Sequence, residues 1–301
     1  MDIDPLLRSV VAVRSSIPDD AFTAAALGTV REGSGAVIRD SGLVLTIGYL
    51  ITEADEVWLT TRDGRVVAAH ALAYDQETGF GLVQALGRLD LPALELGASA
   101  KANLGSAVVF ADGSGRSIRA TIVARQEFAG YWEYLLDEAI FTAPAHPSWG
   151  GAALIGADGK LLGIGSLRLQ MVKGGEAADI NMIVPIDLLS PILDDLLTRG
   201  QANRPPRPWL GVFSAESDGD VVVMSVAPGG PAAEAGLRPG DIISDVRDGQ
   251  VVGLADFYRK LWSSGPAGAE LPMRIVRDGR ESWLRVKSAD RNSFLKKPQL
   301  Q

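Results

Sequence analysis

Short apolar runs separated by turn residues dominate the first two thirds of the chain. Such runs occupy residues 10–13, 33–38, 43–46, 56–60 and 66–72. The segment Arg62-Asp63-Gly64-Arg65 separates the last two runs, and an Asp-Gly pair between two strand-like segments predicts a hairpin. Strands that recur about every 8–12 residues favour a barrel or a sandwich.

The same pattern continues to about residue 184 and then changes period. Strand-like segments lie at 106–110, 118–123, 131–136, 152–155, 161–166 and 181–184. Apolar residues at 188, 189, 193, 196 and 197 then follow a helical spacing, so we expect a helix over 188–197 that ends at Gly200.

A polar, proline-rich segment separates this region from the rest of the chain. Residues 201–208 read Gln-Ala-Asn-Arg-Pro-Pro-Arg-Pro, through which neither a helix nor a central strand can run. We therefore predict a first domain at 1–200, a linker at 201–208, a second domain at 209–290 and a tail at 291–301. A chain of 301 residues fits two domains of about 100–200 residues each.

Composition excludes several classes of function. A formal net charge of −8 gives no positive footprint for a phosphate backbone, so we expect no nucleic-acid partner. The chain has no cysteine and only two histidines, so the common zinc spacings and a disulfide framework are absent from the sequence. We expect neither a metal nor any other cofactor.

The first residues bear on the compartment. Met1-Asp2-Ile3-Asp4-Pro5 is acidic where a signal peptide is positively charged, and no apolar run approaches the about 20 residues of a membrane span. We therefore predict a cytoplasmic protein without a membrane span. A periplasmic location would require a misassigned start or a processed chain.

Four motifs in the first domain resemble trypsin-like serine proteases of the HtrA/DegP type. Residues 33–38, 75–78, 157–164 and 180–186 resemble the family's G-S-G-x-x-I strand, D-x-x-T turn, D-G-x-x-x-G-I hairpin and I-x-F-A-I-P exit segment, in that order. The resemblance implies a mainly β protein, in which a trypsin-like double β-barrel precedes a second domain.

The family's nucleophile loop, P-G-N-S-G-G-P-L, corresponds to Pro-Ser-Trp-Gly-Gly-Ala-Ala-Leu at 147–154. Gly150 stands at the position of the serine, and a glycine cannot attack a carbonyl. Ser148, Trp149 and Gly150 correspond to the loop that forms the oxyanion hole. Ser148 replaces a glycine there, and the indole of Trp149 next to it is expected to plug the cleft.

By the same resemblance, the residues at the two other triad positions are not the histidine and the aspartate of the family. The family's L-T-N-x-H-V-V segment corresponds to 45–51, which places Tyr49 at the histidine position, and Gly79 stands at the aspartate position. A phenol with a pKa near ~10 stays protonated at neutral pH and makes a poor base. The resemblance therefore implies a pseudoenzyme with no intact triad, although residual hydrolysis is left open.

Two alternatives remain at this stage. Ser148 and His146 lie two residues apart on an extended loop, where side chains point the same way, so they could form a relocated nucleophile and base of an active serine endopeptidase. The chain could also be a regulatory subunit that assembles with an active HtrA-like paralogue.

The second domain resembles a PDZ domain (α+β) of the HtrA type. Residues 228–243 read Pro-Gly-Gly-Pro-Ala-Ala-Glu-Ala-Gly-Leu-Arg-Pro-Gly-Asp-Ile-Ile, close to the family's P-G-S-P-A-A-x-A-G-L-x-x-G-D-x-I. Residues 207–212 resemble its carboxylate-binding entry, R-G-x-L-G-V, with Pro208 in place of the usual glycine. Leu254, Phe257 and Leu261 follow a helical spacing.

The resemblance implies a peptide-binding groove. A PDZ groove adds an extended peptide to a sheet edge and holds its terminal carboxylate with backbone amides. By resemblance, the groove residues are Trp209, Leu210, Gly211, Val212, Phe257 and Leu261. The function predicted is that of a catalytically inactive HtrA-like homologue, a scaffold or regulator that binds peptide or protein C-termini and can form a homo-oligomer.

Overall fold

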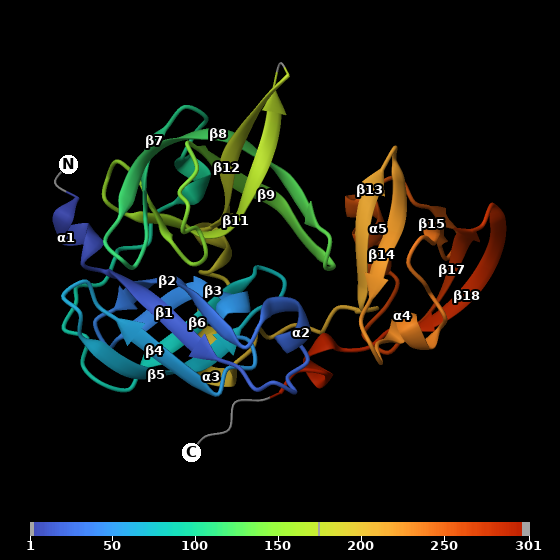
Figure 1. Cartoon of the computed structure of the whole chain (residues 1–301), viewed down its shortest axis with the longest axis horizontal. Helices are drawn as coiled ribbons and strands as arrows, with labels where there is room; N and C mark the ends of the chain where they lie inside the picture. The colour runs from blue at the N-terminus through green and yellow to red at the C-terminus, as the bar shows by residue number, and fades with distance from the viewer. Residues whose placement is uncertain (1–2, 174, 297–301) are drawn as a thin grey trace. The chain divides into compact units, whose positions relative to one another are not determined.

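The computed structural model describes residues 3–173 and 175–296, and antiparallel strands are its main regular secondary structure (Figure 1). Within these residues the first six strands close into a barrel in the order β1–β2–β3–β6–β5–β4. They are β1 (Val10–Ser16), β2 (Val30–Arg39), β3 (Leu43–Ile47), β4 (Glu56–Thr60), β5 (Val66–Tyr74) and β6 (Phe80–Ala85). The predicted hairpin is confirmed, because β4 pairs antiparallel with β5 and Gly64 has φ of 86° in the turn.

A second barrel follows directly in the described chain, in the order β10–β11–β12–β9–β8–β7. Its strands are β7 (Ala107–Ala111), β8 (Ser117–Gly130), β9 (Tyr134–Ala143), β10 (Ala153–Ile155), β11 (Leu161–Lys173) and β12 (Glu176–Pro185). Phe110, Ile140 and Leu154 are fully buried in its core, and the indole of Trp149 packs against them. The two barrels confirm the double-barrel fold class.

Short helices precede, connect or follow the strands of the barrels. They are α1 (Asp4–Leu7), α2 (Ala24–Leu27) and α3 (Leu193–Arg199), with 3₁₀ turns η1 (Gly48–Leu50), η2 (Ser99–Lys101) and η3 (Ile186–Leu188). The helix predicted over 188–197 is wrong in its first half, since α3 begins only at Leu193. Pro191 lies inside the predicted span and cannot donate the backbone hydrogen bond that a helix interior requires. Gly200 ends the helix as predicted, with φ of 72°.

The remaining strands form one sheet in the order β13–β14–β15–β17–β18, with β16 paired to β15. They are β13 (Val212–Ser217), β14 (Asp220–Val226), β15 (Ile242–Val246), β16 (Gly249–Gln250), β17 (Glu270–Arg277) and β18 (Arg280–Lys287). The helices are α4 (Pro231–Glu234), α5 (Leu254–Ser263) and the 3₁₀ turn η4 (Arg291–Ser293). The apolar face predicted for α5 is confirmed, because Leu254, Phe257 and Leu261 are buried.

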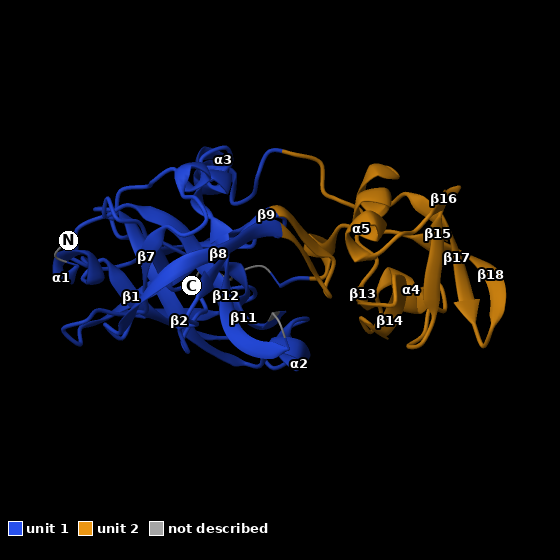
Figure 2. Cartoon of the chain, turned by 90° about the horizontal axis from the view of Figure 1, so that it is seen from above, with its two compact units in different colours: residues 1–126, 138–203, 295–301 blue, residues 127–137, 204–294 orange. Residues whose placement is uncertain are grey.

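The chain forms two compact units (Figure 2). Unit 1 comprises 1–126, 138–203 and 295–301, and unit 2 comprises 127–137 and 204–294. The tip of the β8–β9 hairpin therefore belongs to the same unit as the sheet formed by β13 to β18. Of the predicted tail, residues 297–301 lie outside the described residues. No helix among the described residues is long and apolar enough to span a membrane.

We expect Leu154→Ala to destabilise unit 1 by about 2–5 kcal/mol, because Leu154 is 0% exposed and the surrounding core cannot fill the cavity. The matched control is Leu104→Ala, where the side chain is 64% exposed and the cost should stay within about 0.5 kcal/mol. The free energy of unfolding of both variants is measured by urea titration, with hydrogen exchange of the β10 and β11 amides as the probe. Equal effects of the two substitutions would contradict the packing described here.

Candidate functional site

The loop around Gly150 is fixed by close backbone contacts to both barrels. The carbonyl of Gly150 accepts a hydrogen bond from the Ser34 amide in β2 at 2.8 Å, and the Gly151 amide donates to the Gly165 carbonyl in β11 at 2.9 Å. Gly151 has φ of 75°, and a Cβ there would lie 1.8 Å from the Ser34 carbonyl oxygen. Only glycine fits at this position.

Tyr49 and Gly150, which were predicted to occupy two triad positions, lie together in the structure. Tyr49 sits in η1, directly after β3, and a Cβ placed on Gly150 would be 2.7 Å from Tyr49 Oη. The phenol donates a hydrogen bond to the Ser166 carbonyl at 3.0 Å. Burial raises the pKa of Tyr49, opposed by a side-chain hydrogen bond with Trp149, so the group stays a neutral donor.

Gly79 lies against the residue that precedes Tyr49. The Asp75 carboxylate accepts hydrogen bonds from the Thr78 amide at 2.9 Å and the Thr78 hydroxyl at 2.8 Å, which closes the predicted D-x-x-T turn. Gly79 follows with φ of 82°, and its carbonyl accepts from the Gly48 amide at 2.7 Å. The aspartate position therefore supplies a backbone contact and no charge.

His146 and Ser148 are close, but they are not arranged as base and nucleophile. The Ser148 amide donates to His146 Nδ1 at 3.0 Å, while the Ser148 hydroxyl accepts from the Arg116 guanidinium at 2.7 Å. The imidazole is 1% exposed, with Nε2 4.0 Å from the carboxylate of Asp112. Burial lowers the pKa of His146, opposed by the charge of Asp112. The histidine therefore binds the backbone of Ser148.

The amides of Leu210, Gly211 and Val212 converge on one carboxylate, that of Glu133 in the β8–β9 hairpin. The donor nitrogens lie 3.1, 2.7 and 2.9 Å from its oxygens. Burial raises the pKa of Glu133 to about 7, and the three amide hydrogen bonds oppose that rise. Trp209, also predicted for this site, packs against the Phe294 ring at 4.9 Å.

The predicted pocket residues Phe257 and Leu261 lie in the core of unit 2. Both are 0% exposed and share a buried cluster with Leu210 and with Leu135 of the hairpin. Sequence reasoning missed Glu133 and Leu135, because it treated 131–136 as one uninterrupted strand. The structure instead makes a turn there, between the end of β8 at Gly130 and the start of β9 at Tyr134.

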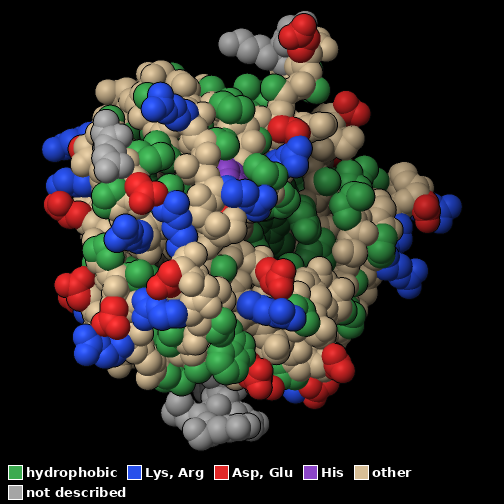
Figure 3. Space-filling model, turned by 60° about the vertical axis from the view of Figure 1, so that its left-hand side comes forward, with side chains coloured by type: hydrophobic (Ala, Val, Ile, Leu, Met, Phe, Trp, Pro, Cys, Tyr) green, Lys and Arg blue, Asp and Glu red, His purple; other side chains and the backbone are tan. Residues whose placement is uncertain are grey.

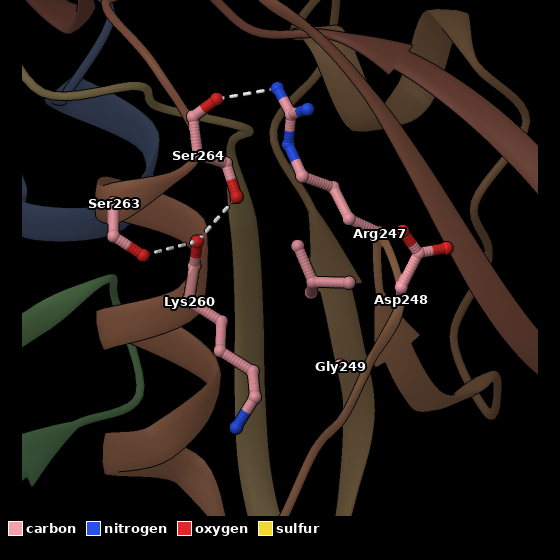
Figure 4. A pocket seen from close by; sticks show the side chains of 7 residues that line it. Arg247, Asp248, Gly249, Lys260, Ser263 and Ser264 are labelled. Carbon is pink, nitrogen blue, oxygen red and sulfur yellow. Dashed lines mark hydrogen bonds between the residues drawn. The ribbon is translucent and has the colours of Figure 1, made fainter.

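A second concave region of unit 2 has no comparable geometry. It is a pocket of about 390 Å³ lined by Val246, Arg247, Asp248, Gly249, Lys260, Ser263 and Ser264 (Figure 4). Its two cationic side chains are already bonded, Arg247 to the Ser264 carbonyl and Lys260 to the carboxylate of Asp256. Neither of these two cations is therefore free to hold an anionic ligand.

Candidate metal ligands and the distribution of surface charge give no further site on the described residues and on the face drawn in Figure 3. Among residues 3–173 and 175–296, no group of three or more His, Cys, Asp or Glu side chains could hold a metal ion. On the face drawn in Figure 3, basic and acidic side chains are intermixed. The convergent features of the described chain are thus the Gly150 loop and the amide loop around Glu133.

Comparison with protein families assigns both parts of the chain. Residues 33–164 match the trypsin-like peptidase domain family, and residues 208–287 match the PDZ domain family. The chain thus combines a trypsin-like protease domain of the HtrA/DegP type with a PDZ domain. Among solved structures, the HtrA-type protease AlgW with decapeptide superposes with a TM-score of 0.55 at 22% identity, covering 99% of this chain and 98% of that one.

Curated relatives are serine endoproteases by name. A probable periplasmic serine endoprotease DegP-like from Halomonas elongata is 24% identical over 273 residues, which cover 86% of this chain and 56% of the relative. Serine endoprotease DegS from Escherichia coli K12 is 26% identical over 276 residues, 84% of this chain and 75% of DegS. The chain thus spans about half the length of its DegP-like relatives.

The predicted cytoplasmic location is contradicted by these relatives. Several are named periplasmic proteases, among them those of Halomonas elongata and Haemophilus influenzae. The prediction rested on acidic residues at positions 2 and 4. Terminal charge reports on export only where that terminus is the one presented to the export machinery, so it was too weak a basis.

The burial of His146 predicts a pH dependence of stability. The folded protein holds this imidazole neutral, whereas the unfolded chain takes up a proton near pH ~6.5. The unfolded state then binds more protons, so stability is fully present above that pH and falls as the pH is lowered. We expect His146→Gln to lose less stability than the wild type between pH ~7.5 and ~5 in urea titrations. Parallel pH profiles would contradict this assignment.

Proposed function

We propose that the protein is a non-hydrolysing homologue of HtrA-type proteases that binds the C-termini of peptide or protein partners as a scaffold or regulator. The observation that carries the proposal is the pair formed by Gly150 and Tyr49, in which the phenol oxygen stands 2.7 Å from where a serine Cβ would be. The names of the curated relatives support a periplasmic location.

The chemistry around the loop supports the loss of hydrolysis. Acyl transfer requires a nucleophile, a base that takes its proton, and an oriented acid. Glycine stands at the first and third positions and a protonated phenol at the second. Removing the nucleophile alone costs other serine proteases about 10⁶ in kcat. The Ser148 amide, a candidate oxyanion donor, is bonded instead to His146 Nδ1.

The amide loop of unit 2 supports partner binding. Three successive amides hold a carboxylate, which is how a PDZ domain holds the end of a peptide. Gly211 has φ of 76°, and a Cβ there would lie 3.0 Å from both Trp209 and Ala227, so the loop depends on glycine. AlgW, whose solved structure resembles this chain in fold, was solved with a decapeptide.

We expect no labelling of the wild type by a fluorophosphonate probe, and none of Gly150→Ser. The new hydroxyl would lack a base and its Cβ would meet Tyr49 Oη at 2.7 Å. Labelling of intact protein, read by mass spectrometry, is the measurement, with DegS as the positive control. Stoichiometric labelling of wild-type Ser148 would instead establish the Ser148–His146 alternative.

We expect peptides with a free C-terminal carboxylate to bind more tightly than the same peptides ending in a carboxamide, by about tenfold or more. Charge-assisted hydrogen bonds to the amide loop are worth more than neutral ones. Fluorescence anisotropy titration of the full chain measures both affinities. Equal affinities of the two peptides would contradict the proposal that the amides of residues 210–212 bind the terminal carboxylate.

A further inference from the structure

In the sheet of unit 2, the edge strand β13 is hydrogen-bonded to the tip of the β8–β9 hairpin. β13 stands at one end of the strand order, so the sheet leaves one edge of β13 unpaired. The Ser214 amide in β13 donates a hydrogen bond to the Tyr131 carbonyl of the β8–β9 hairpin at 2.8 Å. A peptide that adds to a PDZ sheet would make this kind of backbone bond at this edge.

Helix α5 holds the other side of the same segment. The Tyr258 hydroxyl donates to the Gly130 carbonyl at 2.7 Å and accepts from the Glu133 amide at 3.2 Å. Residues 130–133 therefore have hydrogen-bonding partners on both β13 and α5, and the Tyr131 ring lies 6.2 Å from the Phe213 ring. Gly130, Tyr131 and Glu133 of the hairpin tip are therefore each hydrogen-bonded to the rest of unit 2.

The end of this segment imitates a peptide terminus. The Glu133 side chain is 3% exposed, and the three amides of 210–212 enclose its carboxylate as they would a terminal carboxylate. Burial raises the pKa of Glu133 to about 7, while the three amide hydrogen bonds and the charge of Arg291 favour the ionised form.

The backbone conformation of Glu133 independently indicates that its side chain is needed at this position. Its φ is 56°, in the left-handed region, where glycine or asparagine would be less strained. A turn residue chosen for its backbone alone would therefore not be glutamate. The side chain, which reaches the amide loop, accounts for glutamate at this position.

We propose that residues 130–133 are an internal ligand of the PDZ groove, with the Glu133 carboxylate in the place of a partner's C-terminal carboxylate. A partner then binds only after it displaces the hairpin tip. This inference rests on the proposed peptide-binding function and adds its regulation. Because the internal ligand is tethered, it competes at a high effective concentration, and the apparent affinity of a partner falls in proportion to the undocked fraction.

The same geometry indicates the chemistry of the partner. The hairpin contributes Leu135 to the buried cluster that contains Phe257 and Leu261. A partner that replaces the hairpin has to supply both a carboxylate and an apolar side chain to cover this cluster. The test below therefore uses a peptide with a free C-terminal carboxylate and an apolar last residue.

The test uses the full-length chain and the variant Glu133→Gln, which keeps the shape of the side chain and removes its charge. Glu270→Gln is the matched control, because Glu270 lies in β17 of the same unit and its 59%-exposed side chain pairs with Arg285. The probe is the fluorescein-labelled peptide Ala-Gly-Tyr-Trp-Leu with a free carboxylate, which copies residues 129–132 and ends in leucine. Its carboxamide form is the second probe.

We expect Glu133→Gln to bind the free-carboxylate probe about tenfold or more tightly than the wild type, and Glu270→Gln to match the wild type. Without probe, hydrogen exchange at residues 210–212 should be faster in Glu133→Gln alone. Equal probe affinity of Glu133→Gln and wild type overturns the proposal, as does unchanged exchange. Faster exchange with no probe binding to any protein keeps the internal ligand and overturns the peptide-binding function instead.

Discussion

The close approach of backbones around the Gly150 loop is the constraint on which the protease-like unit depends. A Cβ on Gly33 would lie 2.6 Å from the Gly150 carbonyl oxygen, and one on Gly165 would lie 2.2 Å from that of Trp149. Such contacts leave room only for glycine, whatever side chain stands at position 150. The path of the loop is therefore set by backbone packing, independently of the side chain at position 150.

Tyr49 likewise has a structural role that does not depend on catalysis. A phenol buried in this place stabilises the junction between the barrels, because it donates to the Ser166 carbonyl and packs beside Trp149. An imidazole that served as a base would need a free nitrogen directed at a nucleophile. Tyr49 is thus a fixed hydrogen-bond donor, which favours rigidity over reactivity.

Local sequence patterns predicted the architecture well, since each depends on residues close together in the chain. The Asp63-Gly64 hairpin and the apolar face of α5 are of this kind, and the early helix start failed only because Pro191 was overlooked. The contact between Glu133 and the amide loop joins residues 77 to 79 positions apart. No periodicity or motif near Glu133 encodes such a contact, so only the folded chain could reveal it.

The proposed internal ligand gives the trypsin-like domain a role in regulating the PDZ groove. The hairpin that fills the groove is continuous with β8 and β9 of the second barrel. A partner that displaces its tip therefore releases a segment of the protease-like domain, and the free energy of partner binding is coupled to that release.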